Sequence, residues 1–383
     1  MAGALEYIRL GTGDPAPWFT ARGCSNPEYR FDTAAGRYIV LGFFASAHSP
    51  AGQEALAVVR ENRALFDDNH IAFFGISIDP NDEKQGRLKT ELPGIRWFWD
   101  TDLAVSKLYG SVARNFKQGT DGKISARRVW YVLDPTMRIM KTINMDGNPN
   151  HGAELSAFLK SLPAVEKFSG ITLQAPVIYL PNVFEPELCR CLIDIYETQG
   201  GQESGFMRDV GGKTVGIVDY GLKRRSDVVL DDENLLVELR ARLKKRLVPE
   251  IEKVHFFHAS RIERFIVACY DGANGGFFRP HRDHTTKGTA HRRFAVTINL
   301  NNDFEGGELN FPEYGPRTFK PPPGGAVVFS CALLHAVTPV TKGKRYAFLP
   351  FLYDDAAAQI REANNEKLGE GVGAYRSAPV TAG

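Results

Sequence analysis

Hydrophobic and polar positions change their spacing part-way along the chain. Between residues 37 and 161, runs of consecutive apolar residues alternate with segments in which apolar residues recur every three or four positions. The first pattern is typical of buried strands and the second of helices with one buried face. The expected strands are 37–45, 71–79, 95–100, 127–134 and 138–145, and the expected helices are 50–68, 81–91, 102–110 and 151–161. Strands that alternate with helices predict an α/β domain whose sheet is covered on both faces.

A different order of elements follows the joining segment 163–172. A strand and a helix are expected within 175–197, and a long amphipathic helix over 232–254 is interrupted by Pro249. Strands are then expected at 261–271, 292–302, 307–312, 324–330 and 344–354. Helices followed by several short strands predict a β-rich core of jelly-roll type with supporting helices. In residues 356–383 a short helix precedes small and polar residues, and we expect a mobile tail there.

The composition is that of a globular protein with more than one core. The chain has 383 residues, of which 43% are apolar and 24% charged, and this length favours two domains. Lysine and arginine number 47 and aspartate and glutamate 45, so the net charge of +2 gives no reason to expect nucleic acid or a membrane as a partner. The basic clusters 223–225 and 244–246 are expected to be solvated faces.

The chain shows no signal-peptide-like start and no transmembrane-type run. No stretch reaches the roughly 18 consecutive apolar residues that predict a membrane span. Five scattered cysteines, an odd number, argue against a disulfide framework. We therefore expect a cytosolic, cytoplasmic protein. The roles of its cysteines stay open: Cys24, Cys189, Cys191, Cys269 and Cys331.

The segment FRPHRDH places His281 and Asp283 one residue apart. On a strand, residues i and i+2 point to the same face, so the imidazole and the carboxylate could reach one point. His335, which follows an apolar strand and a short turn, supplies a second imidazole. Two imidazoles and one carboxylate, with the opposite face of the metal open, are typical of non-heme Fe(II) oxygenases. Arg345 is a candidate anchor for a dicarboxylic 2-oxo acid, because guanidinium matches carboxylate with two parallel hydrogen bonds.

These motifs stand in the order found in one enzyme family. The matching segments are FIVACYDG (265–272), GGFFRPHRD (275–283), RRFAVTINLNNDFEGGELNFPEYG (292–315) and HAVTPVTKGKRYAF (335–348). They resemble the Fe(II)/2-oxoglutarate dioxygenases, and within them the prolyl 4-hydroxylase-like branch, over residues 175–355. The resemblance implies a double-stranded β-helix (jelly-roll) fold. It also implies hydroxylation of a substrate at the expense of 2-oxoglutarate and O2, with release of succinate and CO2.

The same resemblance implies roles for single residues. The two histidines and the aspartate would bind Fe(II), and Arg345 the distal carboxylate of 2-oxoglutarate. Tyr270 matches a tyrosine that lines the co-substrate pocket, and Asn299 matches a pocket-facing strand position that is often aromatic in relatives. Ascorbate is compatible with such an enzyme as an accessory reductant. The substrate stays open between a small molecule and a prolyl or other amino-acid residue of a peptide or protein, and so does the oligomeric state.

The first part of the chain carries a second resemblance. GDPAPWF (13–19), FFASAHSPAGQEAL (43–56), GISID (75–79) and RVWYVLDPTMRI (128–139) are similar to segments of a peroxiredoxin of the thioredoxin superfamily, over residues 8–162. The family's catalytic proline, threonine and peroxidatic cysteine fall on Ala45, Ser49 and Gly52. Arg128 stands where the family keeps the arginine that lowers the thiol pKa, but peroxidase chemistry needs a thiolate. We therefore expect a thioredoxin-like α/β fold without peroxidase activity.

Two other functions stay open from the sequence alone. Both domains could be scaffolds of a non-catalytic binding or sensing protein, or a relocated cysteine such as Cys24 could serve a thiol peroxidase. His284 and His291 flank the metal motif and are expected on a loop rather than among the ligands. Succinate release that depends on iron, 2-oxoglutarate and O2 would identify the dioxygenase, whereas peroxide consumption would identify the thiol enzyme.

Overall fold

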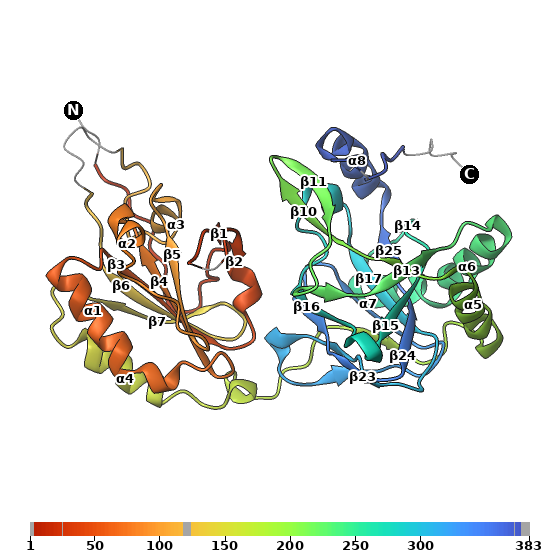
Figure 1. Ribbon diagram of the computed structural model, residues 1–383, viewed down its shortest axis with the longest axis horizontal. Coiled ribbons are helices and arrows are strands. Elements are labelled where there is room, and N and C mark those ends of the chain that lie inside the picture. Colours follow the sequence, from red (N-terminus) through yellow and green to blue (C-terminus); the bar gives the residue numbers. More distant parts are fainter. Residues whose placement is uncertain (1–3, 25, 118–123, 371, 377–383) are drawn as a thin grey trace. The chain divides into compact units, whose positions relative to one another are not determined.

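The computed structural model describes residues 4–24, 26–117, 124–370 and 372–376 (Figure 1). The chain divides into two units: Met1–Gln174 together with Pro312–Gly315, and Ala175–Phe311 together with Pro316–Gly383. Each unit has its own cluster of buried hydrophobic side chains, so each is a separately packed body.

The first unit is built on a five-stranded sheet with the strand order β5-β4-β3-β6-β7. Its strands are β3 (Tyr38–Ala45), β4 (Ile71–Ser77), β5 (Ile95–Trp99), β6 (Val129–Leu133) and β7 (Ile139–Asn144), beside a short ribbon of β1 (Thr20–Ala21) and β2 (Tyr29–Arg30). β3, β4 and β5 are parallel, whereas β6 is antiparallel to β3 and β7 to β6. This sheet confirms the expected thioredoxin-like α/β architecture.

Helices flank this sheet. They are α1 (Pro50–Glu61), α2 (Pro80–Lys84), α3 (Ala104–Leu108) and α4 (His151–Lys160). α1 begins at Pro50 because proline suits the first helical turn and because the Ser49 hydroxyl accepts the Gly52 N–H at 3.0 Å. α1 and α4 pack side by side and bury apolar side chains against one face of the sheet (Figure 1). α2 is shorter than the expected helix 81–91, because Gly86 leaves the helical region with a φ of 60°.

The second unit contains two main sheets, which confirms the expected jelly-roll architecture. The large sheet is formed by β14 (Arg261–Glu263), β25 (Phe351–Tyr353), β17 (Phe294–Asn299), β24 (Lys344–Phe348), β15 (Ile266–Asp271), β13 (Ser226–Val229) and β9 (Gln202–Glu203), with β21 (Ala326–Ser330) and β8 (Ile178–Leu180) added at β17. The small sheet is formed by β12 (Lys223–Arg224), β16 (Phe277–His281), β22 (His335–Val337), β19 (Leu309–Asn310) and β20 (Thr318–Phe319).

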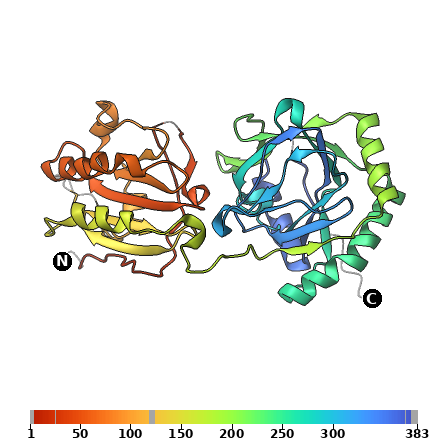
Figure 2. The same ribbon diagram turned by 90° about the horizontal axis from the view of Figure 1, so that it is seen from below.

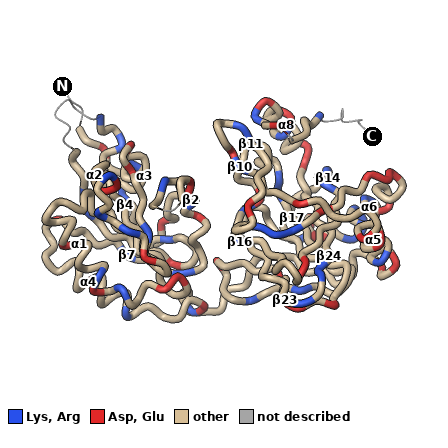
Figure 3. The backbone as a smooth tube through the Cα atoms, viewed as in Figure 1, with Lys and Arg blue, Asp and Glu red and all other residues tan. Residues whose placement is uncertain are grey.

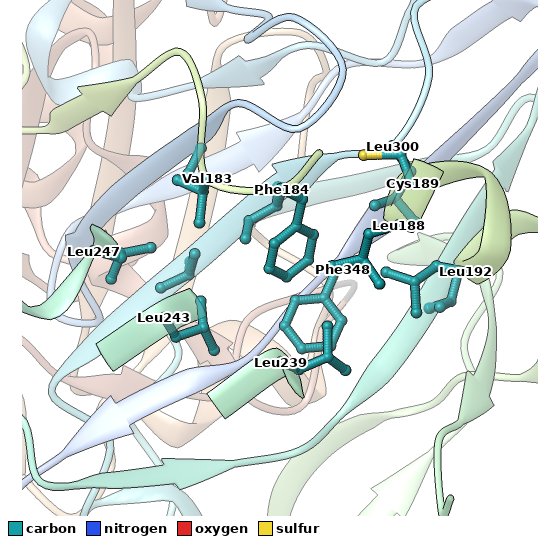
Figure 4. Close-up of a cluster of buried hydrophobic side chains, with 14 of the residues drawn as sticks. Val183, Phe184, Leu188, Cys189, Leu192, Leu239, Leu243, Leu247, Leu300 and Phe348 are labelled. Atoms are coloured by element: carbon teal, nitrogen blue, oxygen red, sulfur yellow. The ribbon is translucent and has the colours of Figure 1, made fainter. Parts of the chain in front are cut away.

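Three helices support the large sheet: α5 (Pro186–Gln199), α6 (Glu233–Arg246) and α7 (Val248–His255). They lie along one side of the strands of this unit (Figure 2). Leucines of α5 and α6 interlock with Phe184 and Phe348 in a buried cluster (Figure 4). The expected interruption of the helix over 232–254 at Pro249 is present as the break between α6 and α7, because proline lacks an N–H and suits the first turn of α7.

The strands of the large sheet divide their side chains between two environments. Val267 and Cys269 of β15 belong to the helix-side cluster, and so do Val296 and Ile298 of β17. Because side chains alternate along a strand, the intervening positions face the opposite side of the sheet. This inner face carries Tyr270 and the other polar side chains described below.

Several features differ from the sequence-based expectations. The hairpin of β10 (Phe206–Val210) and β11 (Lys213–Ile217) and the ribbon of β18 (Glu305–Gly306) and β23 (Val340–Lys342) were not predicted. The segment expected as a mobile tail contains α8 (Asp355–Ala363), in which Ala357 and Ala358 are buried, and Tyr375, which donates its N–H to Asn365. Residues 377–383 of that expected tail lie outside the described residues.

Charges are distributed unevenly between surface and interior. Positive and negative positions are interspersed along both units (Figure 3). Lys244 to Arg246 are exposed as expected, but the cluster at 223–225 is not a solvated face: Lys223 is 5% exposed and the Arg225 side chain 4%. Within the described part of the chain, no helix has both the length and the apolar character needed to cross a membrane.

Candidate active site

Two histidines face each other across the small sheet. β16 ends at His281 and β22 begins at His335, and the two residues are direct partners in the antiparallel register. Their ring centroids lie 4.2 Å apart. Directly opposed residues of antiparallel strands project to the same face, so both imidazoles enter the same space.

Asp283 reaches this space from the loop after β16. The expectation that it shares a strand with His281 is wrong, because β16 ends at His281. The Asp283 N–H instead donates to the Cys331 carbonyl at 3.0 Å, which ties the loop to the turn before β22. The Asp283 carboxylate lies 3.5 Å from Nε2 of His281 and 3.3 Å from Nε2 of His335. The three side chains thus offer one donor atom each within 4.8 Å of one another.

The hydrogen bonds of the histidines determine which nitrogen is free. Nδ1 of His281 lies 2.7 Å from the Arg279 carbonyl, and Nδ1 of His335 lies 3.0 Å from the Leu333 carbonyl. A carbonyl only accepts, so Nδ1 carries the proton and donates in both rings, and Nε2 keeps a lone pair. Burial, with His335 close by, lowers the pKa of His281 to about 4, so this imidazole is neutral at pH 7.

The carboxylate opposite the two rings is ionised. Burial raises the pKa of Asp283, whereas the positive charge that His335 or His281 carries when protonated lowers it well below its ordinary value. Two nitrogen lone pairs that converge on a buried carboxylate are unfavourable unless a cation lies among them. Two neutral imidazoles and one carboxylate are ligands that suit a divalent transition metal such as Fe(II). The donor set therefore fits the expected metal.

Apolar side chains surround the two imidazoles. The Phe278 ring stacks on His281 at a centroid distance of 3.5 Å, and the Phe329 ring meets His335 edge-on at 4.7 Å. A buried cluster continues from there into the inner face of the large sheet: Tyr270, Phe278, Phe304, Val337 and Val340. These contacts fix the imidazole planes and keep water away from the donor atoms.

Arg345 on β24 is held by two side chains of the neighbouring strand β17. Its Nε donates to Oδ1 of Asn299 at 3.1 Å, and its Nη2 donates to Oγ1 of Thr297 at 2.8 Å. Arg345 is 2% exposed, and its Nη1 has no hydrogen-bond partner among the described residues. A buried guanidinium nitrogen without an acceptor is unfavourable, so this arginine is prepared to receive an anion.

Tyr270 lies beside this arginine. The two residues are register partners on β15 and β24, and Cζ of Arg345 is 5.3 Å from the centroid of the Tyr270 ring. A second guanidinium, that of Arg225, is 5.8 Å from the same centroid. Its Nη1 donates a long hydrogen bond of 3.5 Å to the Tyr270 hydroxyl. Tyr270 thus connects the arginine anchor to the apolar cluster that borders the metal donors.

The structure groups the residues singled out from the sequence into two neighbouring sets. His281, Asp283 and His335 form the metal donor set, whereas Arg345, Tyr270 and Asn299 share the inner face of the large sheet. Their assignment as iron and co-substrate ligands stays a prediction. Asn299 acts through Arg345, which it positions.

Two residues of this region were missed in the sequence. Thr297 stands two positions before Asn299 on β17, so strand alternation alone places it on the same face. Arg225 had no such signal, because its burial depends on the pairing of β13 with β15 and β9.

The neighbouring histidines lie outside the donor set. Nδ1 of His284 contacts the Cys331 carbonyl at 3.1 Å. His291 is 1% exposed and its Nε2 lies 2.6 Å from the Glu263 carboxylate. His291 is therefore a buried structural partner rather than the loop bystander that the sequence suggested.

The first unit has no thiol at the position where a peroxidase would need one. A Cβ atom added at Gly52 would lie 1.8 Å from the Ser46 carbonyl oxygen, so the backbone leaves no room for a cysteine there. Arg128 instead pairs with Asp146 at 2.5 Å. Partial burial raises the pKa of the Cys24 thiol, which disfavours the thiolate that a relocated peroxidase would require.

Comparisons with known proteins divide along the same boundary. Residues 265–353 match the family model of the 2OG-Fe(II) oxygenase superfamily. Residues 12–142 match the family model of the AhpC/TSA family.

Curated proteins similar to part of this chain are named PKHD-type hydroxylases. A PKHD-type hydroxylase of Cupriavidus metallidurans is 28% identical over 183 residues, which cover 45% of this chain and 75% of the relative. One of Maricaulis maris is 29% identical over 149 residues, 38% of this chain and 65% of the relative. The PKHD-type hydroxylase PiuC of Pseudomonas aeruginosa is 36% identical over 88 residues, 21% of this chain and 38% of the relative. The chain thus spans less than two thirds of the latter two relatives.

Two solved structures are similar to parts of the chain. A Pseudomonas putida prolyl-4-hydroxylase matches 47% of this chain and 93% of its own, with 16% identity and a TM-score of 0.34. Peroxidoxin BcpB from Mycobacterium tuberculosis matches 41% of this chain and 100% of its own, with 19% identity and a TM-score of 0.34.

Proposed function

We propose that the protein hydroxylates a C–H bond of its substrate with release of succinate and CO2. The proposal starts from the two family matches, which join an AhpC/TSA-type domain to a 2OG-Fe(II) oxygenase domain. The second domain makes the protein an oxidoreductase of the dioxygenase class. One observation carries the proposal. Nε2 of His281, Nε2 of His335 and the Asp283 carboxylate converge on one point beside an apolar cluster that contains Tyr270, the neighbour of a buried, incompletely satisfied arginine.

The metal would be held by His281, Asp283 and His335. When bound, Fe(II) and 2-oxoglutarate supply the activation of O2 that places one oxygen atom on the substrate carbon. The protein holds both imidazoles in the tautomer with a free Nε2 through the two backbone carbonyls described above. Asp283 contributes the single negative charge of the donor set and offsets part of the metal charge.

The co-substrate would be held by Arg345. Its Nη1 and the remaining N–H of Nη2 would bind the distal carboxylate of 2-oxoglutarate. Asn299 and Thr297 prevent the guanidinium from rotating, because each binds a different nitrogen of it. Tyr270 forms the adjoining wall of this pocket. The aromatic side chains around the imidazoles exclude water, which protects the reacting atoms from side reactions.

The substrate in this proposal is a prolyl or other amino-acid residue of a peptide or protein, or a small molecule. Relatives named hydroxylases support hydroxylation as the outcome. Ascorbate would serve as an accessory reductant. The reaction would take place in the cytosol, in keeping with five cysteines that are all free. The interspersed charges support a partner other than nucleic acid or a membrane (Figure 3).

The proposal is tested by incubating the full chain with Fe(II), 2-oxoglutarate and O2, with and without ascorbate, and measuring succinate. Omission of any of the first three should abolish succinate release, and His281→Ala should do the same. Metabolites and peptides treated with the wild-type chain and with His281→Ala are then compared by mass spectrometry for products heavier by one oxygen atom. Succinate release by His281→Ala at the wild-type rate would rule out this centre.

A further inference from the structure

The inner face of the large sheet carries basic side chains that the proposed reaction does not use. Arg225 is matched by Asp227, with Nη2 2.6 Å from its carboxylate. Arg292 is matched by Glu263, with Nη2 2.7 Å from its carboxylate. In each pair, the arginine and the carboxylate neutralise one another within the protein. Arg264 belongs to neither pair.

Arg264 has no polar partner in the described residues. Its Nε is buried without a hydrogen bond, and its guanidinium makes no ion pair there. The guanidinium lies over the Phe351 ring, 4.7 Å from the centroid, and Arg292 approaches the same ring at 4.0 Å. Burial, together with Arg292 and Arg225, lowers the pKa of Arg264 to about 10, so it still carries its charge at pH 7. The Arg264 side chain is partly buried. Asp227 and Glu263 attract its charge and offset part of the lowering of its pKa, but within the described residues each forms its ion pair with another arginine.

The backbone of Arg264 is also strained. It has a φ of 63°, a region that residues with a side chain rarely adopt, between β14 and β15. Such a conformation is unfavourable and is common at sites where a side chain must be presented to a ligand. A partly buried arginine on a strained backbone, without an ion pair of its own, adds little to the stability of the fold, so another role must account for it.

Arg264 is directed toward the metal side of the unit. Phe351, over which its guanidinium lies, alternates on β25 with Leu352 of the helix-side cluster, so Phe351 and this guanidinium lie on the opposite face. On that face, Nη1 of Arg292 lies 3.5 Å from the Asp283 carbonyl, and Arg292 shares the Phe351 ring with Arg264. Arg264 is therefore two side chains away from a metal donor, and it is separate from Arg345.

A cleft is lined by Arg225, one of the cations that act on Arg264, though not by Arg264 itself. It has a volume of about 380 Å³, and Lys223, Arg224 and Arg225 are among its lining residues. Lys223 and Arg225 both donate to the Ser204 hydroxyl, at 2.7 and 3.0 Å. A cleft lined by cations attracts anions and raises their local concentration.

We propose that Arg264, with Arg225 beside it, forms an oxyanion-binding subsite of the oxygenase unit, and that the substrate carries a carboxylate or phosphate group next to the C–H bond that is hydroxylated. The inference rests on the proposed function, because it names the substrate class of that site. Guanidinium binds both oxyanions with two parallel hydrogen bonds. Arg345 remains the anchor of 2-oxoglutarate, so the co-substrate carboxylate and the substrate oxyanion would bind to different arginines.

The test measures anion binding to the full chain loaded with Mn(II) and saturating 2-oxoglutarate, by isothermal titration calorimetry. Inorganic phosphate and acetate are titrated separately to distinguish the two oxyanions. The wild-type chain should bind at least one of them, and Arg264→Gln should weaken that binding at least about tenfold, as expected for a lost charge-assisted hydrogen bond. Arg264→Lys, which keeps the charge and loses the fork, should fall between the two. Phosphate bound at the metal instead would be insensitive to Arg264→Gln.

The matched control is Arg190→Gln, which removes an exposed arginine on α5 whose partner is Glu187, and it should leave anion binding unchanged. Ligand-free Arg264→Gln should unfold at the same temperature as the wild type or higher, because a strained, unmatched cation is removed. A clearly lower unfolding temperature would assign Arg264 a structural role and overturn the proposal. So would equal anion binding by wild type and Arg264→Gln, no anion binding by the wild type, or loss of 2-oxoglutarate binding in Arg264→Gln. Failure of the wild type to bind Mn(II) and 2-oxoglutarate would instead refute the proposed function.

Discussion

Individual side chains set the properties of the metal centre through their protonation. Each histidine donates its Nδ1–H to the backbone carbonyl two residues earlier, so the backbone determines that Nε2 is the nitrogen left free for a metal. Asp283 is the one acidic group of the candidate donor set. The centre is thus prepared before any metal binds, and the main loss on removing the metal is the attraction that holds the three donors together.

Asp283→Ala should abolish metal binding. Removal of an outer partner of a ligand weakens metal binding about 10- to 100-fold, so removal of the only anionic ligand should exceed about 100-fold. Calorimetric titration with Mn(II) measures the loss, and the fold should persist because the core clusters do not include Asp283. Asp194→Ala, at an exposed position of α5, is the control and should bind as the wild type does. Unchanged Mn(II) affinity in Asp283→Ala would contradict the assignment.

Arg345→Lys should weaken the co-substrate much more than it slows the reaction. The substitution keeps a positive charge but loses the planar fork and the contacts to Asn299 and Thr297. Loss of one charge-assisted hydrogen bond is worth about 1.5–3 kcal/mol, so the KM for 2-oxoglutarate should rise roughly tenfold to a hundredfold. Succinate release at varied 2-oxoglutarate measures both parameters. If the KM does not change, the anchor is another residue.

A helix or strand could be predicted from the sequence wherever its own residues show the pattern, such as an apolar run or a proline that ends a helix. The buried runs at 37–45 and 71–79 and the interruption at Pro249 are local, and the structure has β3, β4 and two helices there. The hairpin of β10 and β11 shows no such pattern, because its strands are only partly buried and apolar and polar residues alternate only weakly along them. Its existence depends on pairing rather than on composition.

Of the candidate site, only the residues that belong to a sequence motif could be predicted. The metal donors and Arg345 follow from residue type and order along the chain. Asp283 was placed on a strand in error, because strand ends depend on pairing with β22. The burial of Lys223 and Arg225 could not be foreseen either, since charged residues are mostly exposed and these two are enclosed by distant strands.

Restoring a cysteine to the first helix of the first unit should not restore a peroxidase. In Gly52→Cys the new Cβ meets the Ser46 carbonyl, so the N-terminal turn of α1 must shift. We expect a loss of about 1–3 kcal/mol in the free energy of unfolding, as for other forced insertions into a packed site, and no peroxide consumption. Gly52→Ala is the matched control, because it has the same clash without the thiol and should lose the same stability. Rapid peroxide reduction by Gly52→Cys would show that the loop adapts.

The chain as a whole combines a unit with a candidate metal centre and a unit that matches the AhpC/TSA family but has Gly52 where that family's resemblance places the cysteine. Each unit has its own buried cluster, so each should fold without the other. A retained fold without its nucleophile is best explained by binding, and we expect the first unit to dock the substrate or a partner.

Separate expression of residues 1–174 and 175–383 tests whether the first unit docks the substrate or a partner while the second unit binds the metal and the co-substrate. The second half should bind Mn(II) and 2-oxoglutarate with the affinity of the full chain, because every residue assigned to that task lies within it. Its KM for the substrate found by mass spectrometry should be higher than that of the full chain, because the docking surface is missing. An unchanged KM would refute docking while leaving the oxygenase assignment intact. The first half should not reduce peroxide, and peroxide reduction that disappears in Cys24→Ser would show instead that a relocated thiol is active.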